Sequence, residues 1–456
     1  MVNPMKMRKF FLVSMCFMLI VILFGCVKSL ICGAIRCQIK SGQRITFFIA
    51  SDPHHISRKV HDDGKAFNNF LNTGDGKLLN YTGEIMDAFT REIKNINPDI
   101  LIITGDLTTN GERDSHLEFA QKLKTIEELG TRVFVIPGNH DIENPWARTY
   151  FGEEITKIDS ITRDDFLKIY APYGYKDALS RDTDSLSYLA TPSEDIWLLM
   201  LDSAKYKRNK VRDSPEMGGE ISKKTLGWIE ECGNLAKENN ARIMAVMHHS
   251  LIDHSRLINQ DYTIENNREV KDVLKNCGID LILTGHIHIQ DIKYCEKNNK
   301  TIYDIATSCL IAYPNQYGIL NFIPDKGYDY YTNRVNVEAW ARENNIRDKN
   351  LIDFKEYTRN FFKRRSYDKY YDSLLEISKY SDDEMMAISK TVSTVNLDYF
   401  GGFRNDLLHY IFTTDGFDLL LDSAPNFIRN YVLSMFNDQK TDNNKLFIPI
   451  SLNQKD

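Results

Sequence analysis

Five short apolar runs, each followed at once by polar residues, most restrict how this chain can fold. They are rich in β-branched and aromatic residues, so we expect each to be a buried strand. The runs cover residues 44–51, 99–104, 132–136, 242–247 and 279–284. Segments with apolar residues at helical spacing lie between them, as in residues 84–96 and 223–239. Strands that alternate with helices predict an α/β fold for about residues 44–325.

The five runs bring polar side chains to the carboxyl ends of the predicted strands. In open α/β sheets, these ends form the edge at which ligands bind. Taken singly, most of the motifs are weak signals, since an aspartate in a turn or a pair of core histidines needs no metal. The string Asn139-His140-Asp141 is more specific, because few turns need an amide, an imidazole and a carboxylate side by side. Together the motifs supply seven oxygen or nitrogen donors, which are Asp52, His54, Asp106, Asn139, His248, His286 and His288.

The chemistry of these donors predicts a metal site. Seven donors without sulfur suit divalent ions such as Mn²⁺, Fe or Zn²⁺. They are more than one ion normally takes from a protein, so we expect two metal ions, about 3.5–4 Å apart and bridged by one carboxylate. The eight cysteines contain no C-x-x-C pair, so a thiolate zinc site is not expected.

The order of the motifs resembles the calcineurin-like metallophosphoesterase family. The chain carries D-x-H at 52–54, G-D at 105–106, G-N-H-D at 138–141, a lone histidine at 248 and G-H-x-H at 285–288. The segments around these motifs are similar to the class III cyclic-nucleotide phosphodiesterase branch, in particular to secreted Gram-positive members with a helical C-terminal domain. These segments are SDPHH, GDLTTNGE, PGNHDIENPWAR and TGHIH. The resemblance implies a two-sheet αββα sandwich over residues 41–325, followed by a small all-α domain over residues 326–456.

The resemblance also implies a role for each donor. The first metal would be held by Asp52, His54 and His288, the second by Asn139, His248 and His286, and Asp106 would bridge both. We expect His248 rather than His249 as the ligand, because in this family the ligand comes directly off the strand. The neighbouring histidines His55, His249 and His254 could line the pocket, but a role in supporting the site or in packing is favoured.

The expected reaction is hydrolysis of a phosphoester by a metal-bridging hydroxide, because a pair of metal ions lowers the pKa of a bridging water. His140 would face the scissile phosphate and stabilise or protonate the leaving oxygen, and Asp141 would orient His140 or its loop. No G-x-S-x-G motif or catalytic cysteine pattern is evident, so no protein nucleophile is expected.

The N-terminal residues 1–40 are expected to be a signal peptide or a membrane anchor. Lys6, Arg8 and Lys9 precede an uncharged run over residues 10–27, whose length and flanking charge suit a short span or a secretory signal. The end of this run resembles a lipoprotein box with lipid on Cys26. A buried core helix is the alternative. We expect an exported protein that is tethered at the extracellular face of the membrane by an anchor or by lipid.

Several other segments carry weaker signals. Residues 56–80 are polar and glycine-rich, which predicts a long loop or a partial helix. Residues 353–378 predict a long aromatic helix, and Ser381 with Glu384 forms a capping box. Lys363, Arg364 and Arg365 could meet phosphate or acidic lipid, although a solvated helix face is the more frequent role. The aromatic residues between 142 and 190 could wall a pocket or only pack, which is more common. They are Trp146, Tyr150, Tyr170, Tyr173, Tyr175 and Tyr188.

The leading prediction is therefore a phosphodiesterase that acts on nucleotides, with 3′,5′- and 2′,3′-cyclic ones among the candidates. The alternatives are a phosphomonoesterase or phospholipid head-group hydrolase of the same fold, and a non-catalytic tethered binding module. The complete set of seven donors argues against the binding module. The formal net charge of −6 gives no broad basic surface, so a nucleic-acid polymer is not an expected partner.

Overall fold

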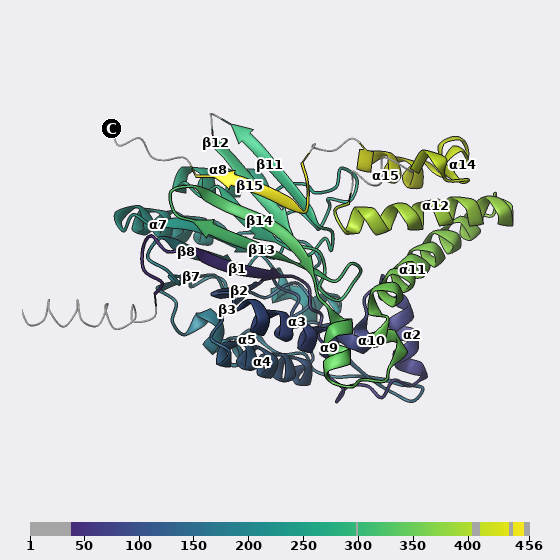
Figure 1. Cartoon of the computed structure of the whole chain (residues 1–456), viewed down its shortest axis with the longest axis horizontal. Helices are drawn as coiled ribbons and strands as arrows, with labels where there is room; N and C mark the ends of the chain where they lie inside the picture. The colour runs from purple at the N-terminus through teal and green to yellow at the C-terminus, as the bar shows by residue number, and fades with distance from the viewer. Residues whose placement is uncertain (1–37, 298–299, 404–410, 437–440, 451–456) are drawn as a thin grey trace, which may run out of the picture.

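The computed structural model describes residues 38–297, 300–403, 411–436 and 441–450. Two mixed sheets lie against each other and a group of helices projects from one end (Figure 1). The predicted signal or anchor falls almost entirely on residues outside the described ranges, so export, tethering and the modification of Cys26 stay predictions. Within those ranges, no helix has the length and apolar character needed to cross a lipid bilayer.

The first sheet has the strand order β15-β14-β13-β1-β2-β3. Its strands are β1 (Ile45–Ala50), β2 (Ile100–Ile103), β3 (Arg132–Val135), β13 (Gln316–Ile323), β14 (Gly327–Arg334) and β15 (Lys445–Pro449). Strands β1, β2 and β3 are parallel, as the alternation with helices predicts. Strands β14 and β15 lie after residue 325 and nevertheless pair into this sheet, so the last part of the chain returns to the sandwich.

The second sheet has the order β11-β12-β10-β9-β8-β7-β6. Its strands are β6 (Ser180–Arg181), β7 (Tyr188–Ala190), β8 (Ile196–Leu201), β9 (Arg242–Met247), β10 (Leu281–Thr284), β11 (Asp291–Lys297) and β12 (Lys300–Ala306). Strands β4 (Arg148–Phe151) and β5 (Glu154–Lys157) form a separate hairpin. Strands β8, β9, β10 and β12 are parallel and neighbouring, so their carboxyl ends share one edge.

Helices cover the outer faces of the two sheets. The helices of this part are α2 (Lys65–Thr73), α3 (Thr82–Ile96), α4 (Arg113–Glu128), α5 (Arg163–Ile169), α6 (Asn209–Arg212), α7 (Lys223–Glu238) and α8 (Asn267–Cys277). Short 3₁₀ or π segments are η1 (Leu79–Tyr81), η2 (Ala171–Tyr175), η3 (Tyr206–Arg208) and η4 (Ile411–Thr413). Figure 1 shows α3, α4 and α5 beside the first sheet and α7 and α8 beside the second.

Strand β8 shows how the layers are held together. Leu198 and Met200 join the main core, which also contains residues of β1 and β2 in the other sheet. Leu199 and Leu201 point the other way, into a second core with Ile229 of α7. A strand that is apolar on both faces is buried between a sheet and helices. The predicted two-sheet αββα sandwich is therefore confirmed.

The C-terminal region is mainly helical, as predicted. It contains α9 (Val337–Glu343), α10 (Lys349–Ile352), α11 (Phe354–Ile377), α12 (Asp382–Phe400), α14 (Phe417–Asp422) and α15 (Asn426–Phe436). Its helices share a core of their own, to which Leu374, Ile388 and Val432 contribute. The capping box is present, because Ser381 accepts from the Glu384 amide and the Glu384 carboxylate accepts from the Ser381 amide. The boundary between residues 325 and 326 stays a prediction.

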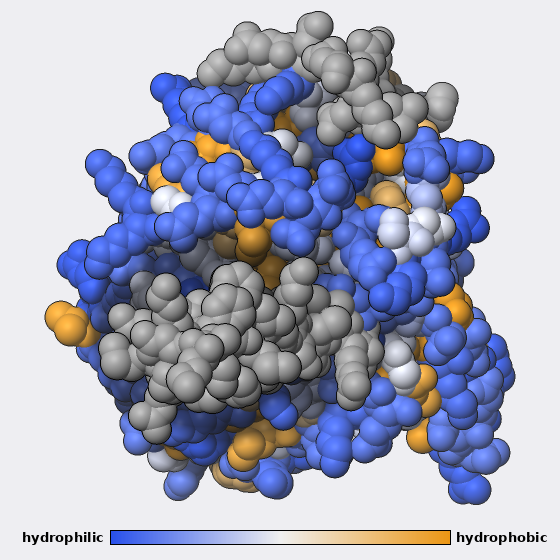
Figure 2. Space-filling model, turned by 90° about the vertical axis from the view of Figure 1, so that its left-hand side faces the viewer, coloured by the Kyte–Doolittle hydropathy of each residue, from blue (hydrophilic) through white to orange (hydrophobic). Residues whose placement is uncertain are grey.

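Most of the aromatic residues between 142 and 190 pack rather than wall a pocket, whereas Trp146 is exposed. Tyr170, Tyr173, Tyr175 and Tyr188 are each at most 4% exposed and belong to the main core. The surface in Figure 2 is mostly hydrophilic where it is described, with scattered apolar residues.

Candidate functional site

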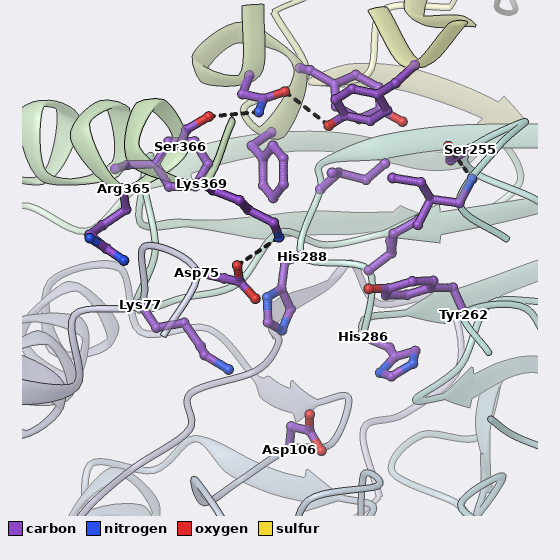
Figure 3. Close-up of a pocket in the computed structure, with 18 of the residues that line it drawn as sticks. Asp75, Lys77, Asp106, Ser255, Tyr262, His286, His288, Arg365, Ser366 and Lys369 are labelled. Carbon is purple, nitrogen blue, oxygen red and sulfur yellow. Dashed lines mark hydrogen bonds and ion pairs between the residues drawn. The ribbon is translucent and has the colours of Figure 1, made fainter. Parts of the chain in front are cut away.

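The polar residues predicted from the strand ends meet at one edge of the sandwich. Asp52 and His54 follow β1, Asp106 follows β2, Asn139 and His140 follow β3, His248 follows β9, and His286 and His288 follow β10. Both sheets contribute, because β1, β2 and β3 belong to the first and β9 and β10 to the second. Figure 3 shows His286, His288 and Asp106 around the cavity at this edge.

The first donor cluster consists of Asp52, His54, Asp106 and His288, each with a ligand atom within 4.8 Å of the others. The Nε2 atoms of His54 and His288 lie 3.2 Å apart. His288 Nε2 lies 3.3 Å from Asp52 Oδ1, and this oxygen is buried without a hydrogen-bond partner among the described residues. A buried carboxylate oxygen without a donor is costly unless a cation binds it. The cluster therefore fits a metal ion.

The second donor cluster consists of Asp106, His248 and His286, whose ligand atoms also lie within 4.8 Å of one another. Asn139 joins it, because its Oδ1 lies 3.1 Å from His248 Nε2. Asp106 is common to both clusters and divides its oxygens between them. Its Oδ2 lies 3.7 Å from His54 Nε2 and its Oδ1 lies 3.4 Å from His248 Nε2. This is the arrangement expected of a carboxylate that bridges two metal ions.

The backbone at these strand ends is strained. Asp52, His54, Asp106, His286 and His288 all have positive φ angles, between 37° and 67°. Each such non-glycine residue costs about 1–3 kcal/mol, and residues of this kind gather at functional sites. With this backbone conformation, Asp52 and His54 point toward one cavity, and so do His286 and His288.

Glycine permits the two sheets to approach at the site. A Cβ atom on Gly285 would lie 2.8 Å from Asp52 Oδ2 and 2.8 Å from Thr104 Oγ1. Only glycine therefore fits between β1 and β10 at this point. A larger residue at position 285 would push β10 away from β1, and His286 would then lie farther from the second cluster. This explains the glycine at the start of G-H-x-H.

Backbone carbonyl groups orient the histidine rings. His248 Nδ1 donates to the carbonyl of Thr104 at 2.8 Å, which leaves Nε2 for the second cluster. His286 Nε2 donates to the carbonyl of Asp261 at 3.0 Å. A bond of this kind fixes the tautomer of a histidine and the direction of its free nitrogen.

The electrostatics suit cation binding. Burial alone would raise the pKa of Asp106, but the nearby His248 and His140 hold it well below its usual range. Burial lowers the pKa of both His54 and His286 well below the ordinary value, so both rings are neutral at neutral pH. Metal ligands must be ionised carboxylates or neutral imidazoles, and these three groups meet that condition. At His248 the Asp106 carboxylate outweighs burial and raises the pKa to about 9, so this ring must lose a proton when a metal ion binds.

Cys309 also lies within reach of the first cluster and was not anticipated from the sequence. Its thiol donates to the carbonyl oxygen of Asp52 at 3.1 Å. Burial raises the pKa of this thiol far above its ordinary value. Through its bond to the Asp52 carbonyl, Cys309 supports the backbone of the first cluster.

His140 and Asp141 occupy different surroundings. His140 Nδ1 donates to the carbonyl of Thr109 at 2.6 Å, and Nε2 lies 3.9 Å from Asp106 Oδ2. Burial lowers the pKa of His140, and the ring lines the cavity. Asp141 does not touch the imidazole. Its carboxylate accepts from the amides of Gly138, Leu107 and Thr108, so it locks two loops together, which is the second of its two predicted roles.

Comparison with known proteins identifies the fold family. The family model described as calcineurin-like phosphoesterase matches residues 45–290, more than half of the chain. The chain belongs to the calcineurin-like phosphoesterase family. This confirms the family that the five motifs predict. Membership also implies divalent metal ions, in agreement with the two donor clusters.

A second family model covers the helical region of this calcineurin-like phosphoesterase. It is described as the C-terminal domain of cyclic nucleotide phosphodiesterase and matches residues 336–442. A probable cyclic nucleotide phosphodiesterase from Vesicomyosocius okutanii is 41% identical over 58 residues, which are 13% of this chain and 24% of that protein. Another from Rhodococcus erythropolis is 23% identical over 194 residues, 42% of this chain and 52% of that protein.

The matched segments thus span about a quarter and about half of the lengths of these two relatives. Among solved structures, a dimetal phosphatase from Danio rerio is similar with a TM-score of 0.45 and 13% identity. That match covers 63% of this chain and 95% of the other.

A cavity of about 240 Å³ opens above the donor clusters. Asp106, His140, His286 and His288 form its floor. The helical region forms another wall, since α11 contributes Phe362, Arg365 and Lys369 and α12 contributes Phe400. Figure 3 shows Arg365 and Lys369 on their helix above the floor residues.

This wall was not predicted from the sequence. Arg365 was expected on a solvated helix face, whereas it lines the cavity. The available signal was the spacing of Phe362, Arg365 and Lys369, which places an aromatic and two cationic side chains on one face of a helix. Lys77, from the segment predicted as a loop or partial helix, lines the cavity as well.

The neighbouring histidines support the site, as expected. His55 Nε2 lies 3.0 Å from Glu118 Oε1, and His249 Nε2 donates to the carbonyl of Met217 at 2.9 Å. His254 is buried between two carboxylates, with Nδ1 2.8 Å from Asp291 Oδ2 and Nε2 3.4 Å from Asp304 Oδ1. It thereby anchors the loop over 250–264, which brings Ser255, Ile258 and Tyr262 to the cavity wall.

The His254 anchor makes stability depend on pH. Burial alone would lower the pKa of His254, but Asp304 and Asp291 outweigh it and raise this pKa to about 9. The nearby ammonium of Lys293, 2.9 Å from Asp291, is the other charge in the cluster. A raised histidine pKa gives stability that is present in full below the unfolded value of about 6.5 and is lost as pH rises through about 9.

We therefore expect the free energy of unfolding to fall with pH more steeply in the wild type than in His254→Gln. Between about pH 7 and 9 the difference in slope should approach about 1.4 kcal/mol per pH unit, which corresponds to one proton. Urea denaturation of both proteins across this range measures it. Equal slopes would show that His254 is not protonated in the folded protein.

Proposed function

We propose that this protein is a dimetal phosphodiesterase that hydrolyses small nucleotides, with cyclic nucleotides as the leading substrate class. The observation that carries the proposal is the division of the Asp106 oxygens between two donor clusters. The names of the two relatives and of the C-terminal family model support the cyclic nucleotide class.

The donors divide between two metal ions in this proposal. Asp52, His54 and His288 would hold the first ion, Asn139, His248 and His286 would hold the second, and Asp106 would serve both. Their oxygen and nitrogen donors suit Mn²⁺, Fe or Zn²⁺. When bound, a pair of such ions supplies Lewis-acid chemistry that activates water and neutralises phosphoryl oxygens.

His140 acts on the leaving oxygen in this proposal. The bond from Nδ1 to the Thr109 carbonyl fixes the ring, so Nε2 is the nitrogen available to the cavity. Because Nδ1 is a donor, Nε2 carries a proton only in the imidazolium form, which the neighbouring Asp106 carboxylate favours and burial opposes. In that form the proton at Nε2 can pass to the oxygen that leaves the phosphorus atom, or can stabilise its developing charge. Asp141 is a positioning residue, because it fixes the loops that carry Asp106 and His140.

Removal of the metal ions should abolish hydrolysis. Protein stripped with a chelator is expected to lose activity on bis(p-nitrophenyl) phosphate and on 3′,5′- and 2′,3′-cyclic nucleotides, and Mn²⁺ should restore it. Rates on this panel, compared with those on phosphate monoesters and phospholipid head groups, test the proposal. A preference for monoesters would indicate a phosphatase, and no hydrolysis with any added metal would favour a binding module.

His140→Asn should slow cleavage most when the leaving group is a poor one. For a cyclic nucleotide, which releases an alkoxide, kcat is expected to fall by about 10²–10⁴-fold, the usual contribution of a general acid. The loss should be much smaller for bis(p-nitrophenyl) phosphate, because p-nitrophenolate leaves without a proton. Steady-state kinetics on both substrates measure this, and elemental analysis checks that the metal content is unchanged. Equal losses on the two substrates would contradict the acid role.

A further inference from the structure

Lys77 brings a positive charge into the cavity that no motif of the family predicts. It lines the same cavity as Asp106, His140 and His288 (Figure 3). Within the described ranges, its ammonium has neither a hydrogen bond nor an ion pair to another side chain. The Lys77 side chain extends toward Asp106 and His288, close to the floor of the site (Figure 3).

The turn that carries Lys77 is fixed from below by the sandwich. The Lys77 amide donates to the carbonyl of Gly74 at 2.9 Å, and the Leu78 amide donates to the carbonyl of Ile311 at 2.8 Å. Lys77 also forms a β-bridge with Ala312. The backbone from which the ammonium extends is therefore held in place by bonds within the phosphoesterase domain.

Helix α11 fixes the same turn from above. Gly76 packs against Phe362 so closely that a Cβ atom would lie 2.6 Å from the Phe362 ring. Arg365 donates to the carbonyl of Asn72, and Lys369 Nζ pairs with Asp75 Oδ1 at 2.9 Å. Phe362, Arg365 and Lys369 lie on one face of the helix, so a single face of the helical domain contacts the whole turn.

The ion pair between Lys369 and Asp75 occupies the carboxylate nearest to Lys77 in the sequence. Asp75 is two residues from Lys77 and is the carboxylate of the same turn. Because Lys369 engages Asp75, the Lys77 ammonium is left for an anion in the cavity. Beside two divalent cations, a further positive charge is favourable only when an anion lies between them. A phosphate group bound over the donor clusters supplies that negative charge.

We propose that Lys77 binds a non-bridging oxygen of the substrate phosphate, and that helix α11 of the C-terminal domain positions Lys77 through the Asp75–Lys369 pair. The inference rests on the proposed function, because it takes the substrate to be a phosphoester held over the two clusters. It gives the helical domain a part in phosphate binding through the turn over residues 74–77, although the reacting groups themselves come from the sandwich.

The first test replaces Lys77 in the Mn²⁺-loaded full-length protein. Isothermal titration calorimetry with inorganic phosphate should show about 10- to 100-fold weaker binding for Lys77→Met, the range for loss of a hydrogen bond to a charged group. Lys77→Arg should recover part of the affinity, and the matched control Lys65→Met, outside the cavity, should bind as the wild type does. Metal content should not fall in any variant.

The second test separates positioning from general damage to the fold. Lys369→Met is expected to weaken phosphate binding, because the freed Asp75 carboxylate then pairs with Lys77. The double variant Asp75→Asn, Lys369→Met should bind phosphate more tightly than Lys369→Met alone. A double variant that binds no better than the single one would overturn the positioning role.

The kinetics distinguish failure of this inference from failure of the proposed function. With bis(p-nitrophenyl) phosphate, Lys77→Met should raise KM by a factor similar to the loss in phosphate affinity. A wild-type protein without hydrolysis would defeat the proposed function, while the phosphate titration would still test Lys77. Active wild type together with unchanged phosphate affinity and KM in Lys77→Met would overturn the inference alone.

Discussion

The sharing of Asp106 between two groups of donors is the constraint on which the site depends. Two metal ions repel each other strongly at short range, and a carboxylate that bridges them offsets that repulsion. For Asp106 to bridge, His54 and His248 must approach it from opposite sides, at 3.7 Å and 3.4 Å from its two oxygens. His54 follows the first sheet and His248 follows the second, so the site exists only where the edges of the two sheets meet.

The sandwich provides this meeting point at a cost in backbone strain and buried polarity. Positive φ angles at Asp52, His54, Asp106, His286 and His288 would be unfavourable in an ordinary turn. The strain is held by surrounding contacts, among them the Asp141 carboxylate, which accepts from amides in both the β2 and β3 loops. The buried ion pairs of His254 hold the loop that carries Tyr262 in place. Contacts around the cavity thus stabilise the strained backbone and the buried polar groups of the site.

Local signals in the sequence were sufficient for the five strands that carry the site, for the long helices and for the floor of the site. Helix α11 covers Phe354–Ile377 within the predicted 353–378, and α3 ends at Ile96, where the predicted helical segment 84–96 also ends. The cavity wall was not predictable in this way. Lys369 and Asp75 are 294 residues apart and have no partner in their own segments, so only the packed domains show the pair. Strand β15 was missed for the same reason, since it pairs with β14 across the whole helical region.

Elemental analysis of Asp106→Asn, beside the wild type, tests the central claim most directly. The substitution keeps the size of the side chain and removes the charge that serves both clusters. Wild-type protein loaded with Mn²⁺ and desalted should retain about two ions per chain, as in other two-metal sites. The variant should retain at most about one, with its fold intact by circular dichroism. A folded variant that still holds two ions per chain would contradict the bridging role of Asp106.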